Sequence, residues 1–315
     1  QQAGQTGQGT VAVAMGTATG QYNQSSYAVA VGYYTGRSNQ GVSAVAVGSE
    51  AGETSQGIQA VAVGQYAGNN TQKYRATAAG YAAGQISQGS NATAVGSGAG
   101  RYNQGANAVA VGDGAAETSQ GASATAVGRL AGYTAQGTSA VAVGYLAGQT
   151  SQSVAATAVG YVAARYNQGN YAVAVGSEAG LTSQGAQAVA MGYQAGYTGQ
   201  GANATAVGYL AGETTQGSYA TAVGNYAGQT SQGAHAVAVG YYAGNDTQGG
   251  QGIAVGYLAG QVSQGLRATG VGYYAGRNNQ GDYAVAVGYA AGQTNQHANS
   301  IVLNATGSAL NTAQA

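Results

Sequence analysis

Residues 44–59 read AVAVGSEAGETSQGIQ and residues 60–75 read AVAVGQYAGNNTQKYR, so one sixteen-residue unit occurs twice in succession. We number the unit so that the glycine closing AVAVG is position 16 and the residue after it is position 1. This glycine recurs at every sixteenth residue from Gly16 to Gly288, and a glutamine recurs at position 8 from Gln8 to Gln296. A free loop tolerates changes in length, so this unbroken period indicates that each position has a fixed place in a stack of repeated coils.

Each unit contains the pattern of two short strands and two turns. Positions 12–15 alternate alanine with valine, as in Ala44–Val47, and a β-branched residue at every second place is typical of a strand. Glycines at positions 16 and 4, such as Gly48 and Gly52, indicate a turn. Residues 53–56 then suggest a second strand and the glycine at position 9 a second turn. The sequence therefore predicts an all-β protein, a parallel β-roll or β-solenoid of sixteen-residue coils.

The repeat changes near the C-terminus. Residues 301–303 are Ile, Val and Leu, and Asn304 stands where the turn glycine belongs. We expect a β-roll repeat region over residues 1–299 and, over residues 300–315, a modified last coil that acts as a cap or as a junction to a following segment. Because such repeats contact only their neighbours, one elongated rod is expected. The alternative, a disordered glycine-rich tract, fits poorly with the strict alternation of valine and alanine.

The glutamine at position 8 is the most regular side chain of the repeat. Parallel in-register stacking places identical side chains above one another. We expect the position 8 amides to form a structural ladder in a dry core, each donating to the next, which explains why neither Asn nor Glu replaces them. The ladder is predicted to include Gln40, Gln56, Gln72, Gln88, Gln104 and Gln120.

The charged residues and the 25 tyrosines avoid the AVAVG strand. All of them except Lys73 fall at positions 1, 2, 5, 6, 10 and 11, which we expect to form the outer surface. Positions 12–16 carry no charge, so both faces of this strand are predicted to be buried: valine toward the interior of its own coil, and alanine against a partner chain whose backbone it allows to approach. This arrangement predicts a homo-oligomer. The alternative is a single-chain roll in which alanine fits a narrow surface groove.

The AVAVG-xxAG unit resembles the head repeats of trimeric autotransporter adhesins of the YadA type, and similar repeats occur in fibre proteins of phages and large viruses. Residues 298–310, ANSIVLNATGSAL, resemble segments that lead from such repeats toward a C-terminal chaperone domain in phage fibres. The resemblance covers essentially the whole chain and implies a left-handed β-roll assembled as a homotrimer. The TSQG portion, with its glutamine at position 8, is not part of the usual family pattern.

No pattern in the sequence indicates chemistry. The eight basic and eight acidic residues cancel, so no basic stripe is available for nucleic acid. The AVAV runs are too short to span a bilayer, and no membrane insertion is expected in this segment. His235 and His297 occupy different positions about four coils apart, so they cannot share a metal. Glu50 and Glu53 lie three residues apart on a presumed turn and make a poor acid–base pair. We therefore expect no enzyme and no catalytic, cofactor or metal site.

The surface tyrosines are the remaining candidate for binding. In-register stacking aligns position 1 tyrosines along one edge, and a strip that can hold sugar rings or a protein surface is predicted at Tyr241, Tyr257, Tyr273 and Tyr289. Alternatively, these rings only cover the turns. The threonines that recur at position 6 suggest a further alternative, an ice-binding array.

A longer period of four units overlies the short one. Residues 37–40 (RSNQ) match residues 101–104 and 165–168 (both RYNQ), and an ETSQ stretch recurs at Glu53 and Glu117. Duplication of blocks of four units explains this period without a functional requirement.

Taken as a whole, the sequence predicts a structural and adhesive extracellular fibre segment, located on a virion or cell surface. Its expected partners are other copies of itself, as a homotrimer, and a host-surface glycan or protein receptor. A bacterial adhesin head or an extracellular filament subunit is the alternative of the same class. An ice-binding solenoid is the alternative of another class.

Overall fold

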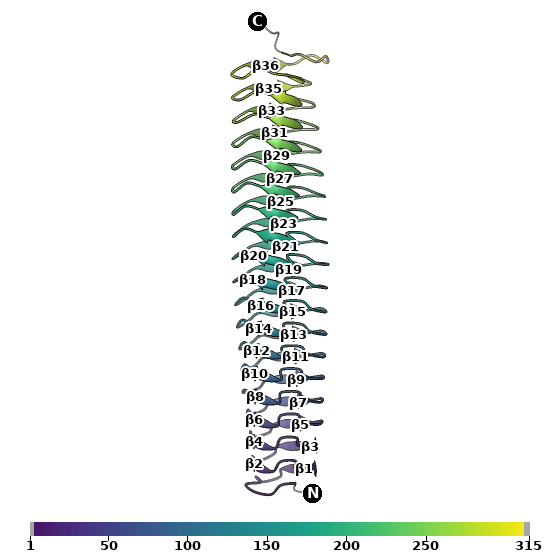
Figure 1. Cartoon of the computed structure of the whole chain (residues 1–315), viewed down its shortest axis with the longest axis vertical. Coiled ribbons are helices and arrows are strands. Elements are labelled where there is room, and N and C mark those ends of the chain that lie inside the picture. Colours follow the sequence, from purple (N-terminus) through teal and green to yellow (C-terminus); the bar gives the residue numbers. More distant parts are fainter. Residues whose placement is uncertain (1–2, 312–315) are drawn as a thin grey trace. The chain divides into compact units, whose positions relative to one another are not determined.

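The computed structural model describes residues 3–311, which form strands and turns without a helix. The chain divides into two compact units, unit 1 (residues 1–156) and unit 2 (residues 157–315). Each unit is a stack of parallel coils in which sixteen residues make one turn (Figure 1). The predicted fold class, an all-β parallel solenoid, is confirmed.

In unit 1, one strand of each coil begins at position 13 and the other at position 6. The first set is β1 (Val13–Thr17), β3 (Val29–Tyr33), β5 (Val45–Val47), β7 (Val61–Val63), β9 (Thr77–Ala79), β11 (Thr93–Val95), β13 (Val109–Val111), β15 (Thr125–Val127) and β17 (Val141–Val143). The second set is β2 (Tyr22–Gln24), β4 (Ser38–Gln40), β6 (Thr54–Gln56), β8 (Asn70–Gln72), β10 (Ile86–Gln88), β12 (Tyr102–Gln104), β14 (Thr118–Gln120), β16 (Thr134–Gln136) and β18 (Thr150–Gln152).

Unit 2 has the same two sets. The first set is β19 (Thr157–Val159), β21 (Val173–Val175), β23 (Val189–Met191), β25 (Thr205–Val207), β27 (Thr221–Val223), β29 (Val237–Val239), β31 (Ile253–Val255), β33 (Thr269–Val271), β35 (Val285–Gly288) and β36 (Ile301–Asn304). The second set is β20 (Tyr166–Gln168), β22 (Thr182–Gln184), β24 (Thr198–Gln200), β26 (Thr214–Gln216), β28 (Thr230–Gln232), β30 (Asp246–Gln248), β32 (Val262–Gln264) and β34 (Asn278–Gln280).

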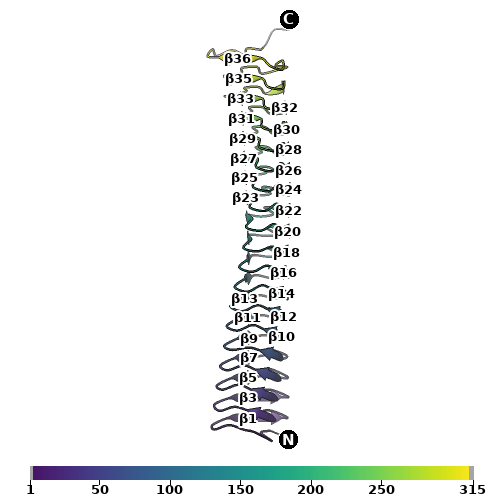
Figure 2. The same ribbon diagram turned by 90° about the vertical axis from the view of Figure 1, so that its left-hand side faces the viewer.

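Within each unit the strands of one set stack into a parallel sheet, and the two sheets lie on different sides of the coil (Figure 2). The register is that of the sequence period: Val45 pairs with Val61, and Gln56 pairs with Gln72. Every position of the sixteen-residue repeat therefore has its equivalent in the coils directly above and below, so identical or similar side chains meet along the stack.

The interior of the coil is lined by alanine and not by valine. Ala46 and Ala62, at position 14, are 0% exposed, whereas Val47 and Val63, at position 15, are 36% and 42% exposed. The prediction that valine points inward and alanine meets a partner chain is therefore wrong, as is the alternative that alanine fills a surface groove. The interior is too narrow for valine: a Cβ added to Gly52 would lie only 3.3 Å from Cβ of Ala46.

Left-handed backbone residues make the corners of the coil. The glycine at position 16 is one of them, as at Gly96, where φ is 127° and an added Cβ would lie 2.6 Å from the carbonyl oxygen of Gly112. Only glycine fits there. Residues other than glycine take positive φ at positions 2, 7 and 11, as Leu130 (56°), Ser55 (55°) and Asn91 (57°) do. These three corners were not predicted.

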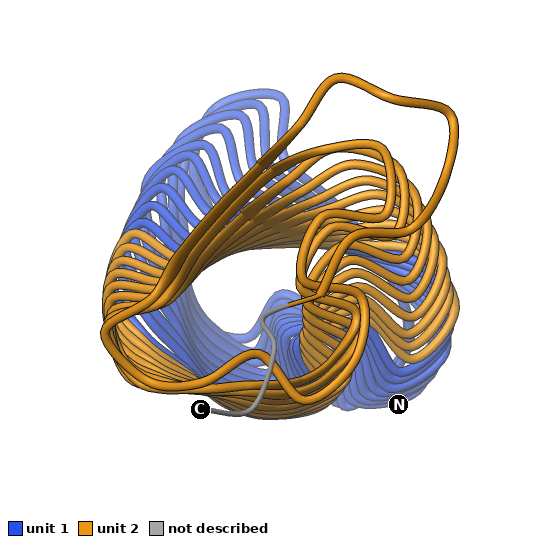
Figure 3. Ribbon diagram, turned by 90° about the horizontal axis from the view of Figure 1, so that it is seen from above, with its two compact units in different colours: residues 1–156 blue, residues 157–315 orange. Residues whose placement is uncertain are grey.

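The last coil differs from the others. β36 pairs in register with β35, but Leu310 and not Gly307 bridges to Ala291, so the loop after β36 is three residues longer than in a regular coil. Figure 3 shows this loop of unit 2 extending beyond the outline of the coils beneath it. Asn304 closes the loop from inside, because its Nδ2 donates to the carbonyl oxygens of Tyr289 and Ser308, both at 2.6 Å. Part of the predicted segment 300–315, residues 312–315, lies outside the described residues.

Candidate functional site

The glutamines of position 8 lie in the ladder that their period suggested. Gln56 is 2% exposed and its Nε2 donates to Oε1 of Gln72 at 3.1 Å, and the same contact recurs from coil to coil. In unit 1 the donor–acceptor distances are 3.0 or 3.1 Å for each step from Gln40 through Gln56, Gln72, Gln88 and Gln104 to Gln120. The ladder is interrupted at its N-terminal end, where Oε1 of Gln40 is buried without a hydrogen-bond partner.

Each glutamine also joins the two strands of its coil. Nε2 of Gln56 donates to the carbonyl oxygen of Val45 at 2.8 Å and lies 3.4 Å from that of Ala60. Asparagine is one methylene too short for this reach, and glutamate has no proton to give to a carbonyl oxygen. The amide thus satisfies polar groups in an interior that otherwise consists mostly of alanine methyl groups.

The four predicted strip tyrosines stack on one another in unit 2. The ring centroids of Tyr241 and Tyr257 are 5.2 Å apart, those of Tyr257 and Tyr273 4.9 Å, and those of Tyr273 and Tyr289 5.3 Å. The planes of these pairs differ by 10°, 8° and 1°. We call these four residues the tyrosine strip.

Ring orientation limits what the tyrosine strip can bind. Each of its rings lies over the next, so the aromatic faces are partly covered by other tyrosines, and ring edges and hydroxyl groups remain for a ligand. The strip therefore presents a row of phenol groups and is less suited to stacking against sugar rings than the sequence suggested. The hydrogen bond from Tyr273 to Tyr274 raises the pKa of Tyr273 to about 12.

Position 2 tyrosines, which the sequence reading did not single out, extend this aromatic surface. Tyr242 stands edge-on to Tyr241 at 4.6 Å, and Tyr226 stacks on Tyr242 at 4.4 Å. Tyr226 also meets the ring of Tyr209 at 5.4 Å, so the aromatic contacts continue past Asn225, where position 1 has no tyrosine. Burial by these neighbours raises the pKa of Tyr226.

Polar side chains at position 5 form a second ladder, at the surface. In unit 1, Arg101 donates through Nε to Gln85 at 2.8 Å and its Nη1 lies 3.5 Å from the carboxylate of Glu117. Glu117 also accepts a hydrogen bond from the hydroxyl of Tyr133, which raises the pKa of Tyr133. Nowhere in the sequence do like charges stand sixteen residues apart, so in-register stacking creates no direct repulsion.

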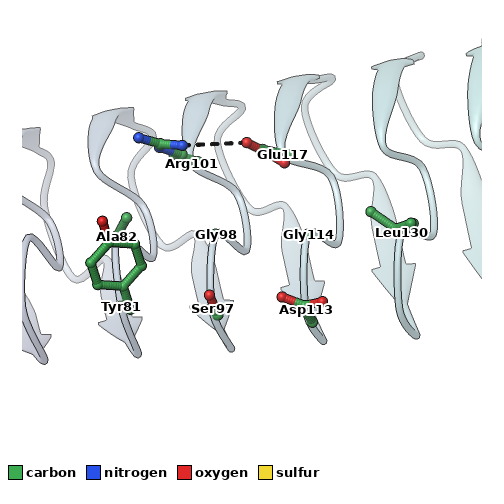
Figure 4. A pocket seen from close by; sticks show the side chains of 9 residues that line it. All are labelled: Tyr81, Ala82, Ser97, Gly98, Arg101, Asp113, Gly114, Glu117 and Leu130. Atoms are coloured by element: carbon green, nitrogen blue, oxygen red, sulfur yellow. Dashed lines mark ion pairs between the residues drawn. The ribbon is translucent and has the colours of Figure 1, made fainter.

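A surface hollow of about 220 Å³ lies beside this ladder in unit 1. Its base is formed by Gly98 and Gly114, both at position 2. Figure 4 shows Ser97 and Asp113 along one side of the hollow and the Arg101–Glu117 ion pair along the other. Tyr81 and Leu130 stand at the two ends. The sequence reading missed this site, although two successive glycines at position 2 could have pointed to it.

The remaining candidates stay apart. His235 stacks on Tyr219 with ring centroids 5.0 Å apart. His235 and His297 occupy different positions of the repeat and belong to coils about four apart. Among residues 3–311 no three His, Cys, Asp or Glu side chains gather as a metal site would require. The same residues include no helix of the length and apolar character needed to cross a membrane.

The outward side chains of positions 13 and 15 make an apolar face on each unit. They run from Val13 and Met15 to Val141 and Val143 in unit 1, and from Thr157 and Val159 to Val285 and Val287 in unit 2. We call each of these the valine face. It contains only Val, Thr, Ile, Met and Ala, and no charged residue.

No protein-family model and no curated protein sequence matches the chain.

Proposed function

We propose that the chain is a structural segment of an extracellular fibre or surface adhesin, in which three copies associate through their valine faces. The observation that carries this proposal is the valine face itself. Val63, for example, is 42% exposed and belongs to an uncharged row that repeats in every coil of its unit. An apolar face of this extent favours association with a partner.

Another copy of the same chain is the partner that fits best. Parallel strands repeat about every 4.8 Å along the stack. A surface that matches this row over many coils must have the same spacing, which a second copy of the repeat supplies. A closed symmetric assembly also buries the face on every copy, and three copies follow the resemblance to trimeric adhesins and fibres.

The interior of the coils supports a mechanical role. Within each unit the paired strands keep the sixteen-residue register, the amides of position 8 bond from coil to coil as Gln56 does to Gln72, and the alanine core leaves little room for movement. Such a segment serves as a stiff, protease-resistant spacer outside the cell or on a virion. The tyrosine strip is its candidate contact with a host protein or glycan, and several copies in one assembly multiply weak contacts.

The geometry speaks against the ice-binding alternative. Threonines of position 6 do stack in register, as Thr198, Thr214 and Thr230 do. The residue that follows each of them is left-handed, for example Thr215 at φ 53°. This corner prevents the flat, extended face that an ordered threonine array requires.

Measurement of mass in solution tests the assembly. The native protein is expected at three times its chain mass of 30.5 kDa, and at 30.5 kDa after denaturation. Val63→Lys should weaken the assembly because it places a charge in the unit 1 valine face of every copy. Ile58→Lys is the matched control, since Ile58 is 49% exposed but lies outside the valine face. A native wild-type mass of one chain, or equal behaviour of both variants, contradicts the proposal.

A further inference from the structure

The hollow in unit 1 exists because two successive coils lack a side chain at position 2. Ala82 precedes and Leu130 follows Gly98 and Gly114 at this position. The volume of about 220 Å³ is below the roughly 300–1,000 Å³ of pockets for drug-sized ligands. It therefore suits one small ring at a time.

Tyr81 offers an aromatic face at one end of the hollow. Its ring is 52% exposed and contacts Tyr66 edge-on, with centroids 5.9 Å apart. The residue stacked next to it at position 1 is Ser97, which has no ring to cover the tyrosine face. In the tyrosine strip, by contrast, Tyr257 covers Tyr241. Tyr81 can thus stack against the C–H face of a ligand in a way that the strip cannot.

The charges around the hollow are balanced. Arg101 lies 3.5 Å from Glu117, and Arg129 lies 3.4 Å from Asp113. Carboxylate oxygens accept hydrogen bonds, guanidinium groups donate them, and the Ser97 hydroxyl does both. This set suits a ligand that carries many hydroxyl groups and no net charge. A strongly anionic or cationic ligand would have to compete with an ion pair already formed.

We propose that this hollow binds a single pyranose ring of a neutral glycan, with one sugar face on Tyr81 and its hydroxyl groups on Asp113 and the Arg101–Glu117 pair. The inference rests on the proposed adhesive role and moves its glycan contact from the tyrosine strip to residues 81–130.

A second hollow lies four coils before the Arg101–Glu117 pair, and at position 2 it has the side chains of Tyr34 and Glu50 in place of the two glycines. It measures about 330 Å³ and is lined by Tyr33, Tyr34, Arg37, Glu50 and Glu53. Arg37 lies 3.5 Å from Glu53, which repeats the Arg101–Glu117 pair after 64 residues. At about 4.8 Å per coil the two hollows are roughly 19 Å apart. They form two subsites on one chain, and binding to both raises the avidity for a long glycan.

Unit 2 supplies a natural comparison. Sixteen residues after Arg165 stands Leu181, where the first two blocks of the 64-residue period have Glu53 and Glu117. The carboxylate that a sugar hydroxyl would meet is therefore missing from the third block. We expect the two subsites of unit 1 to account for glycan binding.

The experiment is binding of the full chain to a panel of neutral oligosaccharides, with uronic acid and amino sugar counterparts, followed by calorimetry and saturation-transfer NMR. Tyr81→Ala removes the aromatic face. Gly98→Leu fills the hollow, and the backbone there accepts a side chain because Leu130 has φ 56° at the equivalent position and a Cβ on Gly98 would meet no atom closer than 4.0 Å. Tyr171→Ala is the matched control, because Tyr171 is 61% exposed and lies outside the hollow and the tyrosine strip. Tyr241→Ala tests the tyrosine strip as the rival site.

We expect Tyr81→Ala and Gly98→Leu each to weaken binding of a neutral glycan about tenfold, and Tyr171→Ala to leave it unchanged, with the native mass the same in all three. Binding that is lost only in Tyr241→Ala, a preference for the charged sugars, or no binding to the panel overturns the inference. The native mass is measured in parallel. If no glycan binds but the native mass is that of three chains, only the glycan site is contradicted. If the wild-type protein has the mass of one chain, the proposed assembly is contradicted as well.

Discussion

The side-chain amide of Gln56 donates a 3.1 Å hydrogen bond to Oε1 of Gln72, which occupies the same place one coil further on. The same nitrogen donates at 2.8 Å to the carbonyl oxygen of Val45 on the opposite strand of its own coil. One side chain thus connects two strands of a coil and two coils of the stack. Since both residues are at most 2% exposed, the loss of either one leaves polar groups that water cannot reach.

Replacement of one glutamine should therefore be costly. Gln88 donates to Thr77 at 2.7 Å and to Gln104 at 3.0 Å, and accepts from Gln72 at 3.0 Å. We expect Gln88→Ala to lower the free energy of unfolding by roughly 3 kcal/mol, measured by urea denaturation, because it leaves a cavity and unpaired buried groups.

The matched control for Gln88→Ala is Gln65→Ala, because Gln65 is exposed at position 1 of its coil. This variant should change the free energy of unfolding by no more than about 0.5 kcal/mol. Gln88→Glu should be worse than Gln88→Ala at neutral pH and should recover in part in acid, since a protonated carboxyl can again donate. Equal stabilities of Gln88→Ala and Gln65→Ala would contradict the role of the ladder.

The period of the sequence was enough to predict the ladder, the parallel register and the two strands of each coil. It could not predict which side of the AVAV strand faces inward, because alanine and valine are both apolar and the alternation has the same period in either orientation. Alanine is predicted on the outer side because it allows a partner backbone to approach closely, whereas in the structure the interior beside Gln56 has room only for alanine.

Other features depend on backbone and ring geometry that a one-dimensional pattern carries weakly. The left-handed corner at position 7 had one signal, the asparagines found there, such as Asn39 and Asn103, since asparagine tolerates positive φ better than most residues. The position of Tyr273 along one edge could be predicted from its period. The tilt of its ring onto Tyr289, which decides what the strip can bind, could not.

The orientation of the strand leads to a second prediction. Ala46 is 0% exposed and Gly52 lies against it, so Ala46→Leu should destabilise the protein by about 1–3 kcal/mol or prevent folding. Val45→Thr should cost less than about 0.5 kcal/mol, because this side chain lies on the outer face and Thr93 occupies the equivalent position. Thermal denaturation of both variants checks the contrast. A costly Val45→Thr together with a harmless Ala46→Leu would restore the opposite orientation.

Two alanines offer a way to stabilise the coils. Ala116 and Ala164 stand at position 4, where nearly all coils have glycine, and their φ values are 46° and 43°. Left-handed geometry costs a residue other than glycine about 1–2 kcal/mol. Glycine in turn lowers the free energy of unfolding by about 0.4–1 kcal/mol, because it gives the unfolded chain more conformational freedom. Ala116→Gly and Ala164→Gly should therefore each stabilise by about 0.5 kcal/mol, seen as a higher melting temperature. The reverse change, Gly100→Ala, should destabilise, because its Cβ would lie 2.8 Å from Cδ of Gln104.

Tyr273 of the tyrosine strip contributes a stabilisation that is lost at high pH. The hydrogen bond to Tyr274, followed by burial, raises the pKa of Tyr273 from 10.0 to about 12 in the folded chain. Above pH 10 the unfolded chain ionises this phenol while the folded chain still holds the proton. The stabilisation is therefore complete below pH 10 and is lost as the pH rises toward 12. We expect the urea midpoint to fall over this interval, and phenolate absorbance to show a late-titrating tyrosine.

Tyr274→Phe should move that titration back toward pH 10, whereas Tyr171→Phe, outside the strip, should leave it in place. A late titration that persists in Tyr274→Phe would show that the hydrogen bond between the two neighbours is not its cause.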